Sequence, residues 1–150
     1  MVRQTPQSLS TLYEADETAW LEAMSELASL GRADALDLVN LAEYLQSMAI
    51  RDYRELKSRL RLLMHHILKW NYQPEKRTSS WRATIKDQRR QLLDIISSKT
   101  MRNGAETNLD ALYAEALEDA IEDTELPPET FPASNPFTLD QWLAQDVVAA

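Results

Sequence analysis

The chain has 150 residues, a formal net charge of −8 and 44% hydrophobic residues, a composition too apolar for a disordered protein and a length suited to one domain with a packed core. It contains no cysteine, which excludes disulfides, thiol catalysis and thiolate metal sites and agrees with a reducing compartment. The sequence has no apolar run of the ~20 residues that cross a bilayer and no apolar signal segment at its N-terminus. We therefore expect a cytoplasmic, acidic protein without a membrane partner.

Glycine occurs only twice in the chain. Because hairpins, tight turns and phosphate-binding loops depend on glycine, its scarcity disfavours sheet-rich folds and nucleotide-binding loops. Four segments instead repeat apolar residues at the three- and four-residue spacing of amphipathic helices. They predict an all-α protein with helices at about 14–30, 34–71, 79–98 and 108–124.

The second predicted helix is long because no helix breaker lies between Asp34 and Pro74. Its apolar spacing slips near residues 48–52, so this segment is either one long helix or two coaxial helices with a bend. Pro74 is expected to end it, since the residue before a proline avoids helical conformation. Asn103-Gly104 is expected to separate the third helix from the fourth.

The C-terminal segment 126–150 has a different composition. It holds four of the six prolines of the chain, which favours an extended strap. Thr138 and Gln141 have the spacing of a capping box for one short terminal helix, and Trp142 is expected to hold the strap against the bundle. The sequence thus predicts a single domain over residues 1–150: a four-helix bundle with a long second helix and a Pro-rich strap that ends in a short helix.

Charge is distributed unevenly along the chain. Residues 1–50 carry 8 acidic and 2 basic side chains, residues 51–102 carry 5 acidic and 14 basic ones, and residues 103–150 carry 11 acidic and no basic ones. One interpretation is that the acidic helices pack beside the basic pair and neutralise it. The other is that the basic hairpin presents a surface to an anionic partner such as RNA.

Metal and nucleophile signatures are weak in this sequence. His65 and His66 are consecutive, so on a helix their side chains point about 100° apart and cannot hold one metal ion together. No Glu lies three residues before either histidine, as the di-iron bundles require, and no Gly-x-Ser-x-Gly elbow is present. We therefore expect no metal ion and no cofactor, and an enzyme is disfavoured.

The candidate binding residues lie on the hairpin formed by the second and third predicted helices. With its turn near Glu75, an antiparallel hairpin places Arg59 near Gln88 and places His66 near Trp81. Such a row can cover the core with its aliphatic stems while its charged heads pair with the acidic helices. It can also bind a partner through its cations and its exposed rings. The candidate binding residues are Arg59, His66, Trp81, Arg82, Lys86 and Arg89.

Several blocks of the sequence resemble a bacterial family of domains of unknown function, the one numbered twenty-nine. These blocks are LYEADETAWLE at 12–22, LDLVNLAEYLQSM at 36–48, SRLRLLMHHILKWNYQPEKRTSSWRATIKDQR at 58–89 and ETFPASNPFTLDQWL at 129–143. The resemblance implies a small all-helical bundle and supplies neither an established activity nor catalytic residues. The chain departs from the expected pattern at Tyr44, where a second acidic residue after Glu43 is expected.

Two functions of different classes remain open. The first is a non-enzymatic interaction module, an adaptor or antitoxin-like protein that binds another macromolecule, with a protein as the expected partner and RNA as the alternative. The second is a metal-independent ribonuclease, because Arg59 or Arg61 followed by His66 is similar to the Arg-x(4–6)-His motif of HEPN domains. In that family the arginine stabilises phosphate charge and the histidine transfers a proton. The sequence does not indicate whether the protein is a monomer or an oligomer.

Overall fold

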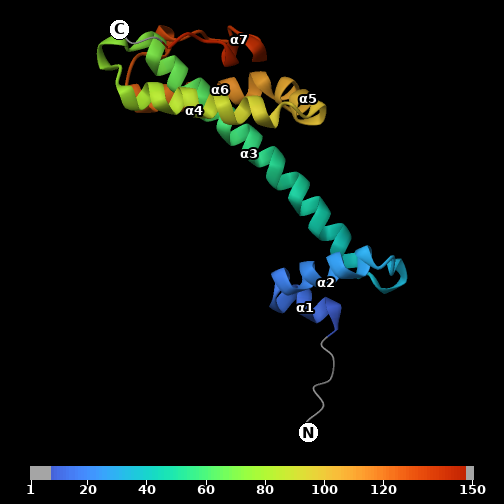
Figure 1. Cartoon of the computed structure of the whole chain (residues 1–150). Helices are drawn as coiled ribbons and strands as arrows, with labels where there is room; N and C mark the ends of the chain where they lie inside the picture. Colours follow the sequence, from blue (N-terminus) through green and yellow to red (C-terminus); the bar gives the residue numbers. More distant parts are fainter. Residues whose placement is uncertain (1–7, 148–150) are drawn as a thin grey trace. The chain divides into compact units, whose positions relative to one another are not determined.

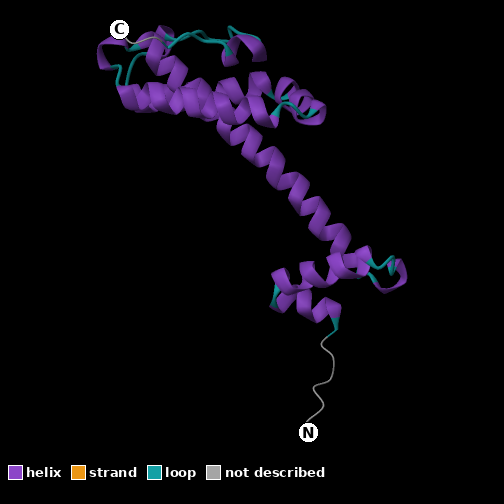
Figure 2. Ribbon diagram, in the orientation of Figure 1, coloured by secondary structure: helices purple, strands orange, loops and turns teal. Residues whose placement is uncertain are grey.

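The computed structural model describes residues 8–147, and these contain seven α-helices and no strand. Figure 1 follows the helices along the chain, and Figure 2 shows that loops and turns connect them. The predicted all-α class is confirmed, as are the long helix and the short C-terminal helix. The helices are α1 (Leu9–Ala15), α2 (Glu17–Ser29), α3 (Leu38–Tyr72), α4 (Ser79–Ile95), α5 (Lys99–Thr107), α6 (Leu109–Thr124) and α7 (Leu139–Leu143).

The chain divides into two compact units, Met1–Ile50 and Arg51–Ala150, which we describe separately. The single-domain organisation stays a prediction. Among the described residues, no helix has both the length and the apolar content that crossing a membrane requires.

The N-terminal unit is organised around Trp20, whose side chain is fully buried. The rings of Tyr13 and Tyr44 lie 4.7 and 5.8 Å from it, and its indole N–H donates to Asp37 Oδ2 at 3.1 Å. The first predicted helix, 14–30, corresponds to α2, and α1 lies largely before the predicted range. The two helices are separated at Asp16, which leaves helical conformation and whose carboxylate caps α2 by accepting from the Ala19 amide.

Helix α3 is a single uninterrupted helix of 35 residues. Of the two alternatives left open by the sequence, the one long helix is therefore correct. It ends at Tyr72, two residues before Pro74 opens a short 3-10 turn, as the proline predicts.

The C-terminal unit is built on the buried seam of α3. The seam follows a spacing of four and three residues through Leu56, Leu60, Leu63, Ile67 and Trp70, all at most 4% exposed. Side chains of α4, α5, α6, the strap and α7 complete one continuous apolar core. They include Ile85, Leu92, Ala105, Leu112, Ala116, Ala120, Phe131 and Trp142.

The expected break at Asn103-Gly104 is wrong, because both residues lie inside α5. The third predicted helix ends instead at Ile95, and Ser98 starts α5 by accepting from the Met101 amide. Gly104 serves close packing rather than a turn, since a Cβ there would lie 2.9 Å from Cε1 of Tyr53 on α3.

The strap is held against the bundle, as predicted. Thr138 and Gln141 form the expected capping box at the start of α7. Trp142 is fully buried, and its indole N–H donates to Asn135 Oδ1 at 2.8 Å. The hydroxyl of Tyr113 on α6 donates to the carbonyl of Pro132. These contacts tie the strap to α6 and tie α7 to the strap.

Candidate functional site

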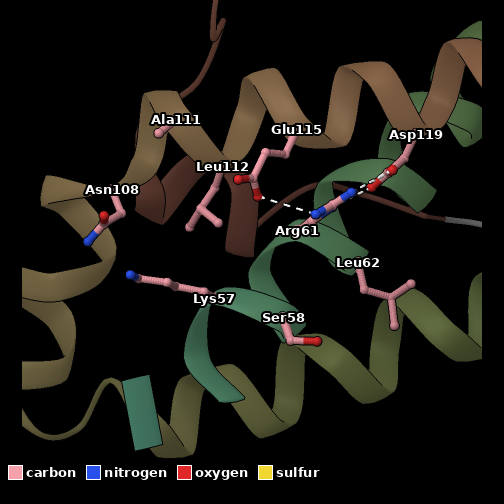
Figure 3. A pocket seen from close by; sticks show the side chains of 9 residues that line it. All are labelled: Lys57, Ser58, Arg61, Leu62, Asn108, Ala111, Leu112, Glu115 and Asp119. Carbon is pink, nitrogen blue, oxygen red and sulfur yellow. Dashed lines mark hydrogen bonds and ion pairs between the residues drawn. The ribbon is translucent and has the colours of Figure 1, made fainter. Parts of the chain in front are cut away.

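Arg61 joins the basic helix α3 to the acidic helix α6. Its Nε and Nη2 donate to the two carboxylate oxygens of Asp119 at 2.5 and 2.7 Å, and its Nη1 lies 3.4 Å from Glu115 (Figure 3). This bidentate contact lowers the pKa of Asp119 and raises that of Arg61. The guanidinium of Arg61 is therefore occupied within the fold.

One carboxylate oxygen of Asp123 accepts two further contacts from α3. Lys69 Nζ donates to Oδ2 at 2.6 Å, and His65 Nε2 lies 3.0 Å from the same oxygen. The Lys69 side chain is only 10% exposed, and its ammonium lies 4.3 Å from the ring centroid of Trp81. The hydrogen bond from Lys69 is the main reason why the pKa of Asp123 is lowered.

The ion-paired residues of the two helices share a spacing. Arg61, His65 and Lys69 are each four residues apart on α3, and their main partners Asp119 and Asp123 are four residues apart on α6. This spacing is visible in the sequence and is compatible with the pairing, but which residues pair depends on how α6 is placed beside α3. On this side of α3, the acidic helix neutralises the basic one.

Arg59 and His66 lie on another side of α3. They are seven residues apart, which is about two helical turns, so they share a face. Arg59 donates to Glu55 at 2.9 Å and to Gln88 of α4 at 3.2 Å, as the hairpin register predicts. His66 Nδ1 donates to the Leu62 carbonyl at 3.1 Å, and burial lowers the pKa of this imidazole. Arg61 does not share this face.

Two more of the predicted binding residues, Trp81 and Arg89, also make contacts within the fold. The ring of Trp81 is half-buried beneath Lys69. Arg89 donates from Nη2 to the Gln145 carbonyl and so ties α4 to the C-terminal segment. The Nε of Arg89 is buried and has no hydrogen-bond partner among residues 8–147.

Arg82 and Lys86 differ from the other candidates. They lie one turn apart on α4, and within the described part of the chain neither side chain makes a hydrogen bond or an ion pair. Lys86 is exposed, and so is Leu93, which follows it by seven residues and is 51% exposed. The cations that α6 leaves unpaired therefore include Arg82 and Lys86 on α4, and the exposed Leu93 lies about two turns further along the same face.

An open groove of about 440 Å³ lies between α3 and α6, with Lys57 and Asn108 at one end and the Arg61 ion pairs at the other (Figure 3). This groove could not be predicted from the sequence, because it depends on how two helices distant in sequence are placed. Over residues 8–147, no group of three or more His, Asp or Glu side chains is arranged to hold a metal ion.

The chain matches the family described as Domain of unknown function DUF29 over residues 12–148. The chain belongs to this family. The resemblance seen in the sequence is thus confirmed, and DUF29 membership names no activity. No curated protein and no solved structure matches the chain.

Proposed function

We propose that this DUF29 chain is a non-enzymatic interaction module, an adaptor or antitoxin-like protein, and that α4 binds an acidic segment of a partner protein. The observation that carries the proposal is the contrast between two sets of cations. Arg61 and Lys69 are paired with carboxylates of α6. Arg82 and Lys86 make no ion pair among the described residues.

The neighbourhood of Arg82 and Lys86 favours a protein partner over a nucleic acid. Exposed Leu93 adds an apolar contact to the cationic row, which suits a peptide segment carrying both carboxylates and an apolar side chain. Residues 103–150 carry 11 acidic and no basic side chains and would repel a phosphate backbone approaching the same unit.

The test compares the wild type with Arg82→Glu/Lys86→Glu. Affinity purification from the native host should recover a stoichiometric partner, and the purified pair should bind at least about tenfold more weakly with the double variant. Lys99→Glu is the matched control, because Lys99 is an exposed lysine of α5 without an ion pair in the described residues. Arg89 is left unchanged because its contact with Gln145 holds the C-terminal segment. Equal binding by the double variant, or no partner at all, would count against the proposal.

A ribonuclease is the second candidate, because Arg59 and His66 share one face of α3. Arg61 is not available for this role while Asp119 holds its guanidinium. The assay compares RNA cleavage by the wild type and by His66→Ala. RNA cleavage by the wild type that is lost in the variant would favour the ribonuclease. A wild type that cleaves no RNA would exclude this candidate function.

A further inference from the structure

The N-terminal unit leaves large apolar side chains in solvent. Of the eight large hydrophobic residues that are exposed in the described chain, five lie between residues 30 and 50. Val39 is 82% exposed, Leu38 62% and Leu45 58%. Apolar surface gathered in this way marks an interaction site. The five residues are Leu30, Leu38, Val39, Leu45 and Ile50.

Four of the exposed residues of α3 follow a heptad repeat. Leu38 and Leu45 are seven residues apart, as are Ala42 and Ala49, and the two pairs interleave at spacings of four, three and four. All four side chains are exposed. This is the a/d pattern of a coiled-coil seam, with leucine at one position and alanine at the other. We call these four residues the α3 heptad.

The α3 heptad faces away from the rest of its unit. Trp20 of α2 contacts Tyr44 of α3 and Asp37, which directly precedes α3. Tyr44 directly precedes Leu45, so its side chain points about 100° away from the heptad. Helices α1 and α2 therefore cover a different side of α3.

We propose that the α3 heptad binds the α3 heptad of a second copy of this chain in an antiparallel helix pair. About a two-fold axis midway between residues 43 and 44, Leu38 of one copy faces Ala49 of the other, and Ala42 faces Leu45. Every contact then sets a large side chain against a small one, so that the two helices interdigitate. The same patch serves both copies, as a closed two-fold dimer requires.

Charge supports a second copy as the occupant. Residues 38–50 contain one charged residue, Glu43, so two such segments approach with little repulsion and a basic partner would find few carboxylates there. A contact of two heptads lies at the small end of specific interfaces, so the dimer is expected to dissociate in the micromolar range, on the order of 1–100 µM. This inference does not depend on the function proposed for α4.

The first test is sedimentation of the full chain between about 1 and 500 µM, where the wild type should pass from monomer to dimer. Leu45→Glu should weaken the dimer at least about tenfold, since it places a charge in the seam. Leu93→Glu is the control, because Leu93 is similarly exposed but lies on α4. A wild type that stays monomeric, or a dimer that Leu45→Glu does not weaken, overturns the proposal. A monomer would also be the outcome if an unrelated protein covers the heptad.

The second test determines whether the two α3 helices are antiparallel or parallel. It uses disulfide cross-linking of single-cysteine variants, which is possible because the chain has no natural cysteine. In the antiparallel pair, Leu38→Cys and Ala49→Cys chains mixed and oxidised should form a covalent heterodimer. Either variant alone should not, because like positions lie about 16 Å apart along the axis and a disulfide needs about 4–7 Å between Cα atoms. Rapid cross-linking of Leu38→Cys alone would indicate a parallel pair and contradict the geometry.

Discussion

The carboxylate of Asp123 is the hydrogen-bond partner of two side chains of α3. A single oxygen accepts from both Lys69 and His65, and the Lys69 ammonium is nearly enclosed. Replacement by asparagine would leave this ammonium without its counter-charge. We expect Asp123→Asn to lower the free energy of unfolding by about 1–2 kcal/mol, measured by urea denaturation.

The control for this substitution lies next to it in the sequence. Glu122 is exposed and makes no ion pair among the described residues, so Glu122→Gln removes the same charge without exposing a buried cation. Equal destabilisation by the two variants would mean that the overall charge of α6, rather than the contact with Lys69, decides the result.

The two histidines predict a pH dependence of stability. Burial is the main cause that lowers the pKa of both His65 and His66 in the folded chain. Below about pH 6.5 the histidines of the unfolded chain therefore bind protons more readily than those of the folded chain. The free energy of unfolding falls as the pH is lowered. We expect a decline from pH 7 to pH 5 by urea denaturation, and a flatter profile for His65→Gln/His66→Gln.

Carboxylates act in a separate pH window. The lowered pKa values of Asp119 and Asp123 contribute stability above about pH 4 that is lost only as the pH falls further. A double histidine variant that kept the full decline between pH 7 and pH 5 would show that groups other than the imidazoles produce it.

Helix α5 is placed by the closeness of its backbone to α3. Gly104→Ala should raise helix propensity by about 1 kcal/mol, yet its Cβ would lie 2.9 Å from the Tyr53 ring. Since the cost of overpacking is about 1–3 kcal/mol, we expect a net loss of about 1 kcal/mol in urea denaturation. In a Tyr53→Ala background the same change should become neutral or stabilising. Additive effects of the two substitutions would contradict a direct contact.

Elements with local signals could be predicted from the sequence. Pro74 ends a helix because its ring disfavours helical conformation in the residue before it. Thr138 and Gln141 cap α7 through hydrogen bonds between residues only three positions apart. Gly104 was misread as a break because its role depends on Tyr53, which lies 51 positions earlier in the sequence. Helix α1 was not predicted because its seven residues give less than one full repeat of the apolar spacing, through Leu9, Leu12 and Tyr13, although Ser8 caps it.

Across the whole molecule, complementarity between acidic and basic segments was one of two interpretations of the sequence, and the sequence did not indicate which cations are paired. Arg61 was a candidate catalyst by its spacing from His66, and its partner Asp119 became visible only when α6 was placed beside α3. Arg89, a candidate contact for a partner, donates a hydrogen bond to the carbonyl of Gln145, which the sequence did not indicate. The candidate row on α4, Arg82 and Lys86, is the part of the predicted surface that these contacts leave open.

The buried position of Trp20 also gives the protein an optical label. Trp20 is the single tryptophan of residues 1–50, whereas Trp70, Trp81 and Trp142 all belong to the C-terminal unit. The difference between the fluorescence of the wild type and that of Trp20→Phe isolates the emission of the N-terminal unit. The unfolding of each unit can therefore be followed by its own tryptophan fluorescence in the intact chain, without an attached dye.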